Sequence, residues 1–179
     1  MNIFEQMSTI KGLGTIIEEA SRRKKAQKIL LKKMLETGLR VDKDGRFYFD
    51  NIRVSDTALA ESLGIDRRVV RQTANYILTE PNLECIFTRL KPVAFFKDAA
   101  HHLGFTVIVI TSYPEKPGII SEVTSIIAKH KLIIREVFAE DPELFEEPKL
   151  TLIIEGDIPP EVISELQSIK VVKSLTIIK

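Results

Sequence analysis

The stretch VSDTALAESLGIDRRVVRQTANYIL, residues 54–78, determines the architecture of the first half of the chain. Apolar residues recur at helical spacing on both sides of Gly64, so the stretch predicts two helices joined by a short turn. Ser55 and Asp66 each stand where a side-chain oxygen can cap the helix that follows. Gly64 adopts the positive φ of a tight turn at little cost. Two capped helices joined by so short a turn must cross at a steep angle.

The second predicted helix has an apolar face and a polar face. Its inward residues are Val69, Val70, Thr73, Ala74 and Ile77, and its outward residues are Arg67, Arg68, Arg71, Gln72 and Asn75. Arginine pairs with guanine, and asparagine and glutamine pair with adenine. All three side chains also bind phosphate, so the outward face predicts a DNA-binding surface. The alternative interpretation is a helical hairpin within a larger helical core, with the arginines as a solvated face.

These residues resemble the helix-turn-helix of bacterial and archaeal transcription regulators, over about 25 residues. The resemblance implies that the start of the second helix enters the major groove. A winged form is left open. The Asp-Gly turn at residues 42–45 and the segment 46–49 predict a turn and a strand. Residues 83–90 predict a second strand that would complete the wing, and Pro81 ends the helix before it.

Two further helices are expected in this half. One lies within residues 15–39 and ends at Gly38. Residues 21–25 interrupt its apolar face, so the helix is either solvated or broken there. The other connects the two halves over residues 93–103 and ends at Gly104. The basic stretch 22–33 is interpreted as a solvated helix face, with contact to the DNA backbone or a role in dimerisation as alternatives.

From residue 105 the pattern changes to strands and helices in alternation. Strands are predicted at 105–112, 132–138, 150–155 and 171–178, and helices at 118–131 and 159–169. The order βαββαβ is that of ferredoxin-like domains, so the chain is α+β. The first of these helices is expected to bury Ile119, Ile120, Val123, Ile126 and Ile127. We therefore expect two domains, residues 1–97 and 98–179.

The loop before that helix predicts a ligand site. Pro117 favours a helix start, and Gly118 lets a ligand approach the backbone closely. The first N–H groups of the helix attract an anion such as a carboxylate. Glu115 is expected to receive an ammonium group. The alternative is a tight strand-to-helix turn that contains Pro-Gly for steric reasons alone.

The segment 107–132 resembles the start of an ACT domain, and the resemblance extends over residues 105–179. In that family a loop reading Asp-x-Pro-Gly binds an effector in regulators and enzymes of amino-acid metabolism. The effector-binding residues that this implies are Glu115, Lys116, Pro117, Gly118, Ile119, Ile120 and Ile133. Glu115 replaces the usual Asp, and Ile133 stands where the family often has Asn. Because isoleucine makes no side-chain hydrogen bond, either the pocket prefers an apolar side chain or the domain serves only for assembly.

The strands of this half do not alternate between apolar and polar residues. Residues 107–110 and 152–154 are uniformly apolar, which predicts that both faces of the sheet are covered. We expect pairing with another sheet or domain, and the simplest arrangement is a symmetric dimer.

Charge and composition assign different partners to the two halves. Residues 1–97 hold 18 lysines and arginines against 12 acids, a net +6, while residues 98–179 hold 8 against 13, a net −5. A basic half suits a polyanion. The lone cysteine, Cys85, excludes an internal disulfide and favours a reducing, cytoplasmic compartment. No signal peptide or membrane span is expected, and the chain lacks the motifs of the common enzyme classes.

Together, the two resemblances identify the chain as similar to archaeal helix-turn-helix–ACT proteins predicted to regulate amino-acid metabolism. They imply a cytoplasmic, non-enzymatic transcriptional regulator without a cofactor or metal. Its expected partners are DNA, a small-molecule effector such as an amino acid, and further copies of itself. The alternative is a regulatory subunit that docks on a biosynthetic enzyme and carries feedback control. Repressor and activator remain equal alternatives.

Overall fold

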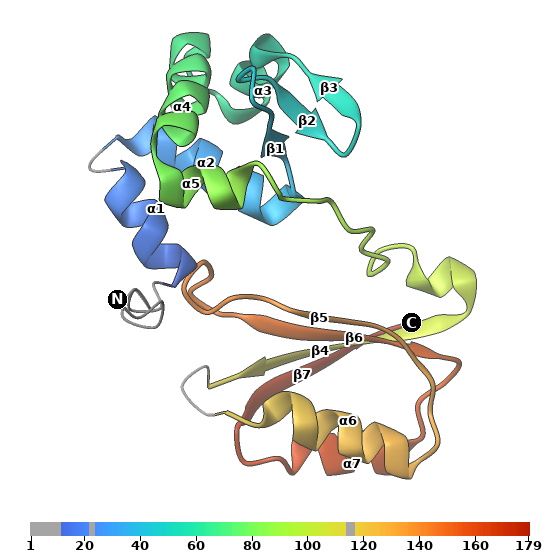
Figure 1. The fold of residues 1–179 in the computed structure, drawn as a ribbon. Coiled ribbons are helices and arrows are strands. Elements are labelled where there is room, and N and C mark those ends of the chain that lie inside the picture. Colours follow the sequence, from blue (N-terminus) through green and yellow to red (C-terminus); the bar gives the residue numbers. More distant parts are fainter. Residues whose placement is uncertain (1–11, 22–23, 114–116) are drawn as a thin grey trace, which may run out of the picture. The chain divides into compact units, whose positions relative to one another are not determined.

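The structure, a computed structural model, describes residues 12–21, 24–113 and 117–179. The chain divides into two compact units, Met1–Ala94 and Phe95–Lys179 (Figure 1). Each unit contains helices and one antiparallel sheet, which makes this a mixed α/β protein. Within the described residues, no helix has the length and apolar character needed to cross a membrane.

The first unit is helical with a small sheet. Its elements are α1 (Leu13–Ser21), α2 (Lys25–Thr37), β1 (Arg40–Val41), β2 (Phe47–Phe49), β3 (Ile52–Val54), α3 (Asp56–Leu63), α4 (Arg67–Thr79) and α5 (Pro81–Phe87). Of the two alternatives for residues 21–25, the helix is broken: α1 ends at Ser21, Lys24 is not helical, and α2 begins at Lys25. The predicted end at Gly38, which has φ 70°, is confirmed.

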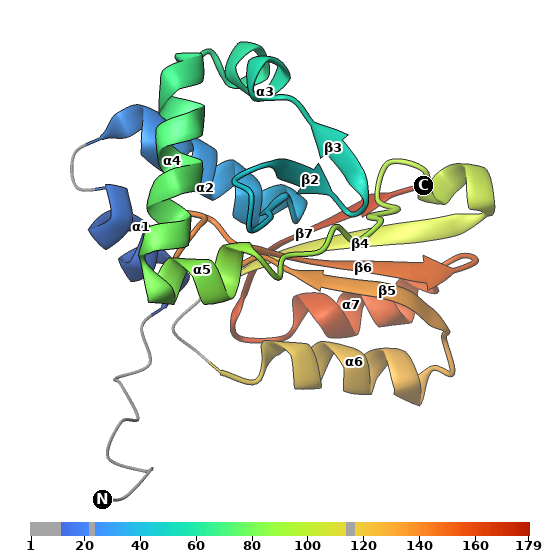
Figure 2. The same cartoon turned by 45° about the horizontal axis from the view of Figure 1, so that its top comes forward.

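Helix α4 is the centre of this unit. It contacts α2, α3 and α5, and Figure 2 shows it beside α2. Val70, Ala74 and Ile77 recur at helical spacing and are fully buried. Because this stripe faces the core, the opposite side of α4 faces solvent.

The predicted wing strand at residues 83–90 is wrong, because this segment contains helix α5. Leu83 and Phe87 are one helical turn apart, and both are buried. Pro81 ends α4, as expected, but it also occupies the first turn of α5, where the missing N–H costs nothing. A wing built from residues 46–49 and 83–90 therefore does not form.

The predicted strand at residues 46–49 instead joins a three-stranded sheet of order β1-β2-β3. The Asp-Gly turn is confirmed. The carboxylate of Asp42 accepts hydrogen bonds from the amides of Asp44 (2.9 Å) and Arg46 (2.8 Å), and Gly45 has φ 72°. The strands β1 and β3 went unpredicted, since two or three residues carry too little periodicity.

The predicted connecting helix at residues 93–103 is also wrong for most of its length. Residues 90–96 have no helix, and only Ala100–Leu103 form a short 3₁₀ helix, η2, which ends at Gly104 as expected.

The segment between the units is held at both ends. On the first unit, a Cβ at Gly38 would lie 2.3 Å from the carbonyl oxygen of Lys91, so only glycine fits there. On the second unit, the ring of Phe95 packs 4.8 Å from that of Phe138, and the amide of Phe96 donates to Glu136 over 3.0 Å.

The second unit has the predicted βαββαβ order. Its elements are β4 (Phe105–Ser112), α6 (Ile119–Lys129), β5 (Ile134–Ala139), β6 (Lys149–Glu155), α7 (Pro160–Gln167) and β7 (Val172–Ile178). The strands form an antiparallel sheet of order β5-β6-β4-β7, and α6 and α7 lie on one face (Figure 1).

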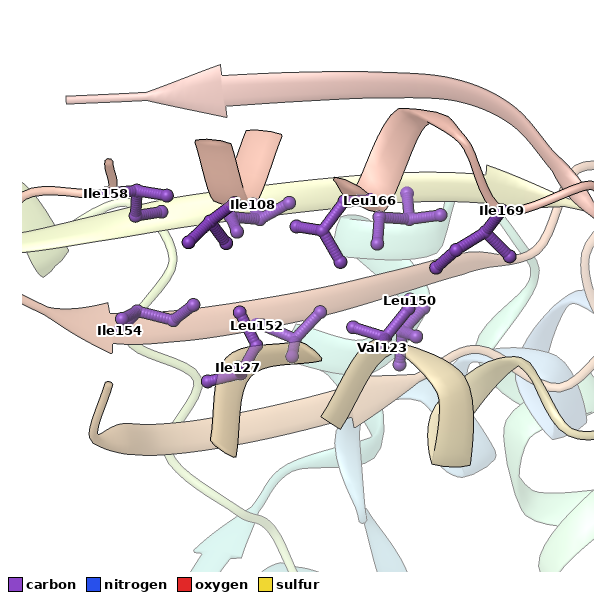
Figure 3. Close-up of a cluster of buried hydrophobic side chains, with 11 residues drawn as sticks. Ile108, Val123, Ile127, Leu150, Leu152, Ile154, Ile158, Leu166 and Ile169 are labelled. Atoms are coloured by element: carbon purple, nitrogen blue, oxygen red, sulfur yellow. The ribbon is translucent and has the colours of Figure 1, made fainter. Parts of the chain in front are cut away.

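The core of this unit lies between that face and the two helices. Figure 3 shows Ile108, Leu152 and Ile154 of the sheet beside Val123 and Ile127 of α6. The prediction that α6 also buries Ile120 is wrong, because this side chain is 46 % exposed. Ile119 and Ile126 are partly buried.

The other face of the sheet is covered in part by the chain itself. Val107, Val109 and Ile153 pack with Ala100 of η2 in a second buried cluster. This contact accounts for part of the uniformly apolar strand sequence without a second sheet.

Truncating the core side of α6 tests the observed helix face. Ile127→Ala should lower the free energy of unfolding by about 2–5 kcal/mol, since it leaves a cavity under the sheet. Ile120→Ala on the same helix is the control and should cost less than about 1 kcal/mol. Urea unfolding followed by circular dichroism measures both, and equal losses would contradict the assigned face.

A charge cluster joins the end of α6 to α7. Lys129 Nζ lies 2.9 Å from both carboxylate oxygens of Glu165, and Nε2 of His130 lies 2.9 Å from one of them. The hydrogen bond from Lys129, followed by that from His130, lowers the pKa of Glu165.

Removing this carboxylate should therefore destabilise the protein in a pH-dependent way. Because folding lowers the pKa of Glu165, its stabilisation is present above the unfolded pKa and is lost as pH falls through the folded pKa. Glu165→Gln should be less stable than the parent at neutral pH, and the difference should vanish on acidification. Thermal unfolding across pH measures this, with the exposed Glu147→Gln as control. A difference that persists in acid would exclude the carboxylate as its cause.

Candidate functional site

The pair α3 and α4 has the predicted local chemistry. The hydroxyl of Ser55 accepts the amide hydrogen of Ala58 (3.1 Å), and the carboxylate of Asp66 accepts that of Arg68 (2.6 Å). Gly64 has φ 62° and ends α3. The two caps and the glycine therefore define a three-residue turn between the helices, as the sequence indicates.

The polar side of α4 is exposed at every position predicted to contact DNA, namely Arg67, Arg68, Arg71, Gln72 and Asn75. Within the described part of the chain, the side chains of Arg67 and Arg68 make no ion pair or hydrogen bond. Arg71 differs, because its guanidinium lies 3.6 Å from the carboxylate of Asp56 at the start of α3. The Arg71 side chain is still 74 % exposed, so this pair is weak and leaves the group accessible.

Residues of other elements lie near Gln72 and Asn75 of α4. A Cβ on Gly45 would lie 3.7 Å from Oδ1 of Asn75, so the β1–β2 turn lies against α4. On another side, Gln72 shares a cavity with Lys24 and Lys25 at the start of α2. Sequence reasoning missed this proximity, because it depends on how α2 packs against α4. Arg22 and Arg23 of the basic stretch lie outside the described residues.

The predicted effector loop is described only in part. Glu115 and Lys116 lie outside the described residues. Pro117 and Gly118 are exposed, and Gly118 has φ 103° at the start of α6, where no side chain caps the helix. Of the two following residues, Ile119 is partly buried and Ile120 exposed.

Ile133 is not brought to this loop within one chain. It follows α6, whereas Pro117 and Gly118 precede that helix, whose 11 residues span roughly 16 Å. Ile133 is 54 % exposed, and its carbonyl accepts the amide hydrogen of Glu155 at the far end of the sheet. The described members of the predicted effector set therefore form two separate groups in a single chain.

Two charged residues near the loop were absent from the sequence prediction. The Oε1 atom of Glu122 lies 4.0 Å from the position of a Cβ on Gly118, so a carboxylate already faces the start of α6. Nζ of Lys173 lies 4.4 Å from the centre of the Tyr113 ring. Glu122 opposes an anion there and attracts an ammonium group, while Lys173 provides a cation near the start of the loop.

No cluster of three metal-ligating side chains occurs in residues 12–21, 24–113 and 117–179. The single cysteine, Cys85, is exposed on α5.

Comparison with known proteins gives no assignment by sequence. No family model matches the chain, and no curated protein matches it.

Three solved structures are similar at low identity. The regulatory subunit of aspartate kinase from Thermus thermophilus, in its ligand-free form, has 15 % identity and a TM-score of 0.37; the match covers 42 % of this chain and 51 % of that one. The protein PH0061 has 20 % identity and a TM-score of 0.29, with 86 % and 89 % covered. An AsnC-family transcriptional regulatory protein from Pyrococcus furiosus has 12 % identity and a TM-score of 0.25, with 95 % and 88 % covered. With TM-scores this low, the three likenesses do not establish a shared fold or family.

Proposed function

We propose that the chain is a DNA-binding transcriptional regulator whose second unit binds a small molecule, an amino acid being the expected effector. The observation that carries this proposal is the exposed polar side of α4. Its first turn holds Arg67 and Arg68, which have no partner in the described part of the protein. Gln72 follows on the same exposed side. A capped helix with this side chain set matches the demands of the major groove, where guanidinium and amide groups read base edges.

The net charge of the first half supports the same proposal. A surplus of six positive charges over residues 1–97 attracts a phosphate backbone. The acidic second half is unsuited to that role. A docking surface for an enzyme needs no such separation of charge, so the regulatory-subunit alternative gains nothing from it.

For the second unit we propose effector binding at the loop before α6 and assembly into a homodimer or larger oligomer. Because Ile133 and Gly118 lie at opposite ends of α6, a site that contains both requires two chains. Ligand binding can then change the affinity for DNA only if the ligand binds two arrangements of the assembly with unequal affinity.

Replacing the first two arginines of α4 tests DNA binding. Arg67→Ala combined with Arg68→Ala should weaken binding to a selected genomic fragment by about tenfold or more, because each bidentate base contact contributes about 1–3 kcal/mol. Arg89→Ala with Lys91→Ala removes the same charge elsewhere in the unit and should cost much less. Gel retardation over a salt series measures both. Unchanged affinity in the α4 variant, or equal losses in both, would reject α4 as the interface.

Calorimetry against the common amino acids tests the effector site. At least one should bind, and Glu115→Gln should weaken it because the variant removes the expected partner of the ammonium group. Glu147→Gln is the charge-matched control. Light scattering at micromolar concentration should show more than one chain per particle. If no amino acid binds, the second unit serves only for assembly. If light scattering shows a monomer, a site shared between two chains is contradicted.

A further inference from the structure

A cavity of about 250 Å³ lies in the first unit between the start of α2 and the middle of α4. Its lining is formed by Lys24, Lys25, Ala26, Gln27, Val69, Gln72, Thr73 and Tyr76. Among these residues are two exposed lysines and no acid. The cavity therefore combines positive charge with several hydrogen-bonding groups.

Gln27 is the polar residue that sets this cavity apart from an ordinary surface hollow. Gln27 is only 5 % exposed, and among the described residues its side-chain amide has no hydrogen-bond partner. In the described residues, no side-chain nitrogen or oxygen is both fully enclosed and unpaired, so the Gln27 amide keeps some accessible surface. Because Gln27 lines the cavity, we infer that the amide opens onto it. A buried amide without a protein partner is costly unless a ligand or water satisfies it.

The start of α2 adds donors on the same side. This helix has 13 residues, and no side chain caps its first turn at Lys24. The first N–H groups of a helix have no intrahelical acceptor, and they carry the positive end of the helix dipole. The residues that carry these donors, Lys24, Lys25, Ala26 and Gln27, all line the same cavity.

We propose that this cavity binds a phosphate group, held by the start of α2, the side-chain amide of Gln27, and the two lysines. A phosphate group accepts several hydrogen bonds at once, which suits donors arranged around a small volume. Thr73 is less available, because its hydroxyl already donates to the carbonyl of Val69 over 2.8 Å.

The phosphate has two possible sources with the same chemistry, the DNA backbone and a free phosphate compound. Gln72 belongs to the cavity lining and also to the exposed side of α4. A DNA phosphate bound here would fix the register of α4 in the groove. Only this DNA source depends on the proposed function. Binding of free phosphate does not depend on that function.

The first arm of the test is an NMR titration of the chain of residues 1–179 with inorganic phosphate, with sodium chloride at equal ionic strength as reference. Signals of Lys24, Lys25 and Gln27 should shift in a saturable way with phosphate and not with chloride. Gln27→Glu keeps the side-chain volume but adds a negative charge, and should weaken phosphate binding by about tenfold or more. If this variant does not fold, Lys24→Gln with Lys25→Gln changes only exposed residues and should have the same effect.

The second arm measures DNA binding over a salt series with the same variants. Lys32→Gln with Lys43→Gln, which lie outside the cavity, is the charge-matched control. If the phosphate belongs to DNA, the cavity variants should lower the magnitude of the log–log salt slope by about 0.9, the value for one neutralised phosphate. If they lose inorganic phosphate but keep the parent slope, the cavity serves a free phosphate compound. The proposal would be overturned if phosphate caused no saturable change in the NMR signals and the cavity variants kept the parent salt slope. The Arg67 and Arg68 variant separates the two proposals, because it should lose DNA binding and still bind inorganic phosphate.

Discussion

The burial of one stripe of α4 is the constraint on which the first unit depends. Val70, Ala74 and Ile77 are fully enclosed by neighbouring elements, and this fixes the rotation of the helix about its own axis. This fixed rotation determines which residues of the helix are exposed to solvent. Arg67 and Arg68 in its first turn are exposed, whereas Val70 in the same turn faces the core. The buried apolar residues and the exposed polar residues of α4 thus lie on opposite sides of the same 13-residue helix.

How far the sequence predicts this fold depends on the length of each pattern. The strand at Phe105–Ser112 was predicted to the residue, and the other strands and helices of the second unit to within a few residues, because each element extends over six or more residues. The segment around Leu83 and Phe87 is a short apolar run, which suits a strand or a helix equally until its burial is known. Its neighbour Pro81 ends one helix and begins another, and sequence reasoning used only the first property.

The candidate site was predictable where it lies on one helix and unpredictable where it spans several. The outward residues of α4 follow from its own periodicity and its cap at Asp66. The approach of Lys24 and Lys25 to Gln72 depends on packing between elements almost 50 residues apart, and periodicity carries no such information. The same limit applies to Ile133, which sequence similarity groups with Gly118 although α6 separates them.

The segment between the units has a mechanical consequence. Lys91 lies against Gly38 on one side, and Phe95 packs on Phe138 on the other, so Val93 and Ala94 lie between two fixed anchors. Val93 is 82 % exposed and restrained by little besides its own torsions. So few residues have a short reach, which limits how far apart the two anchors can lie. Lengthening this connection with glycine and serine would relax that limit without touching the contacts of Gly38 or Phe138.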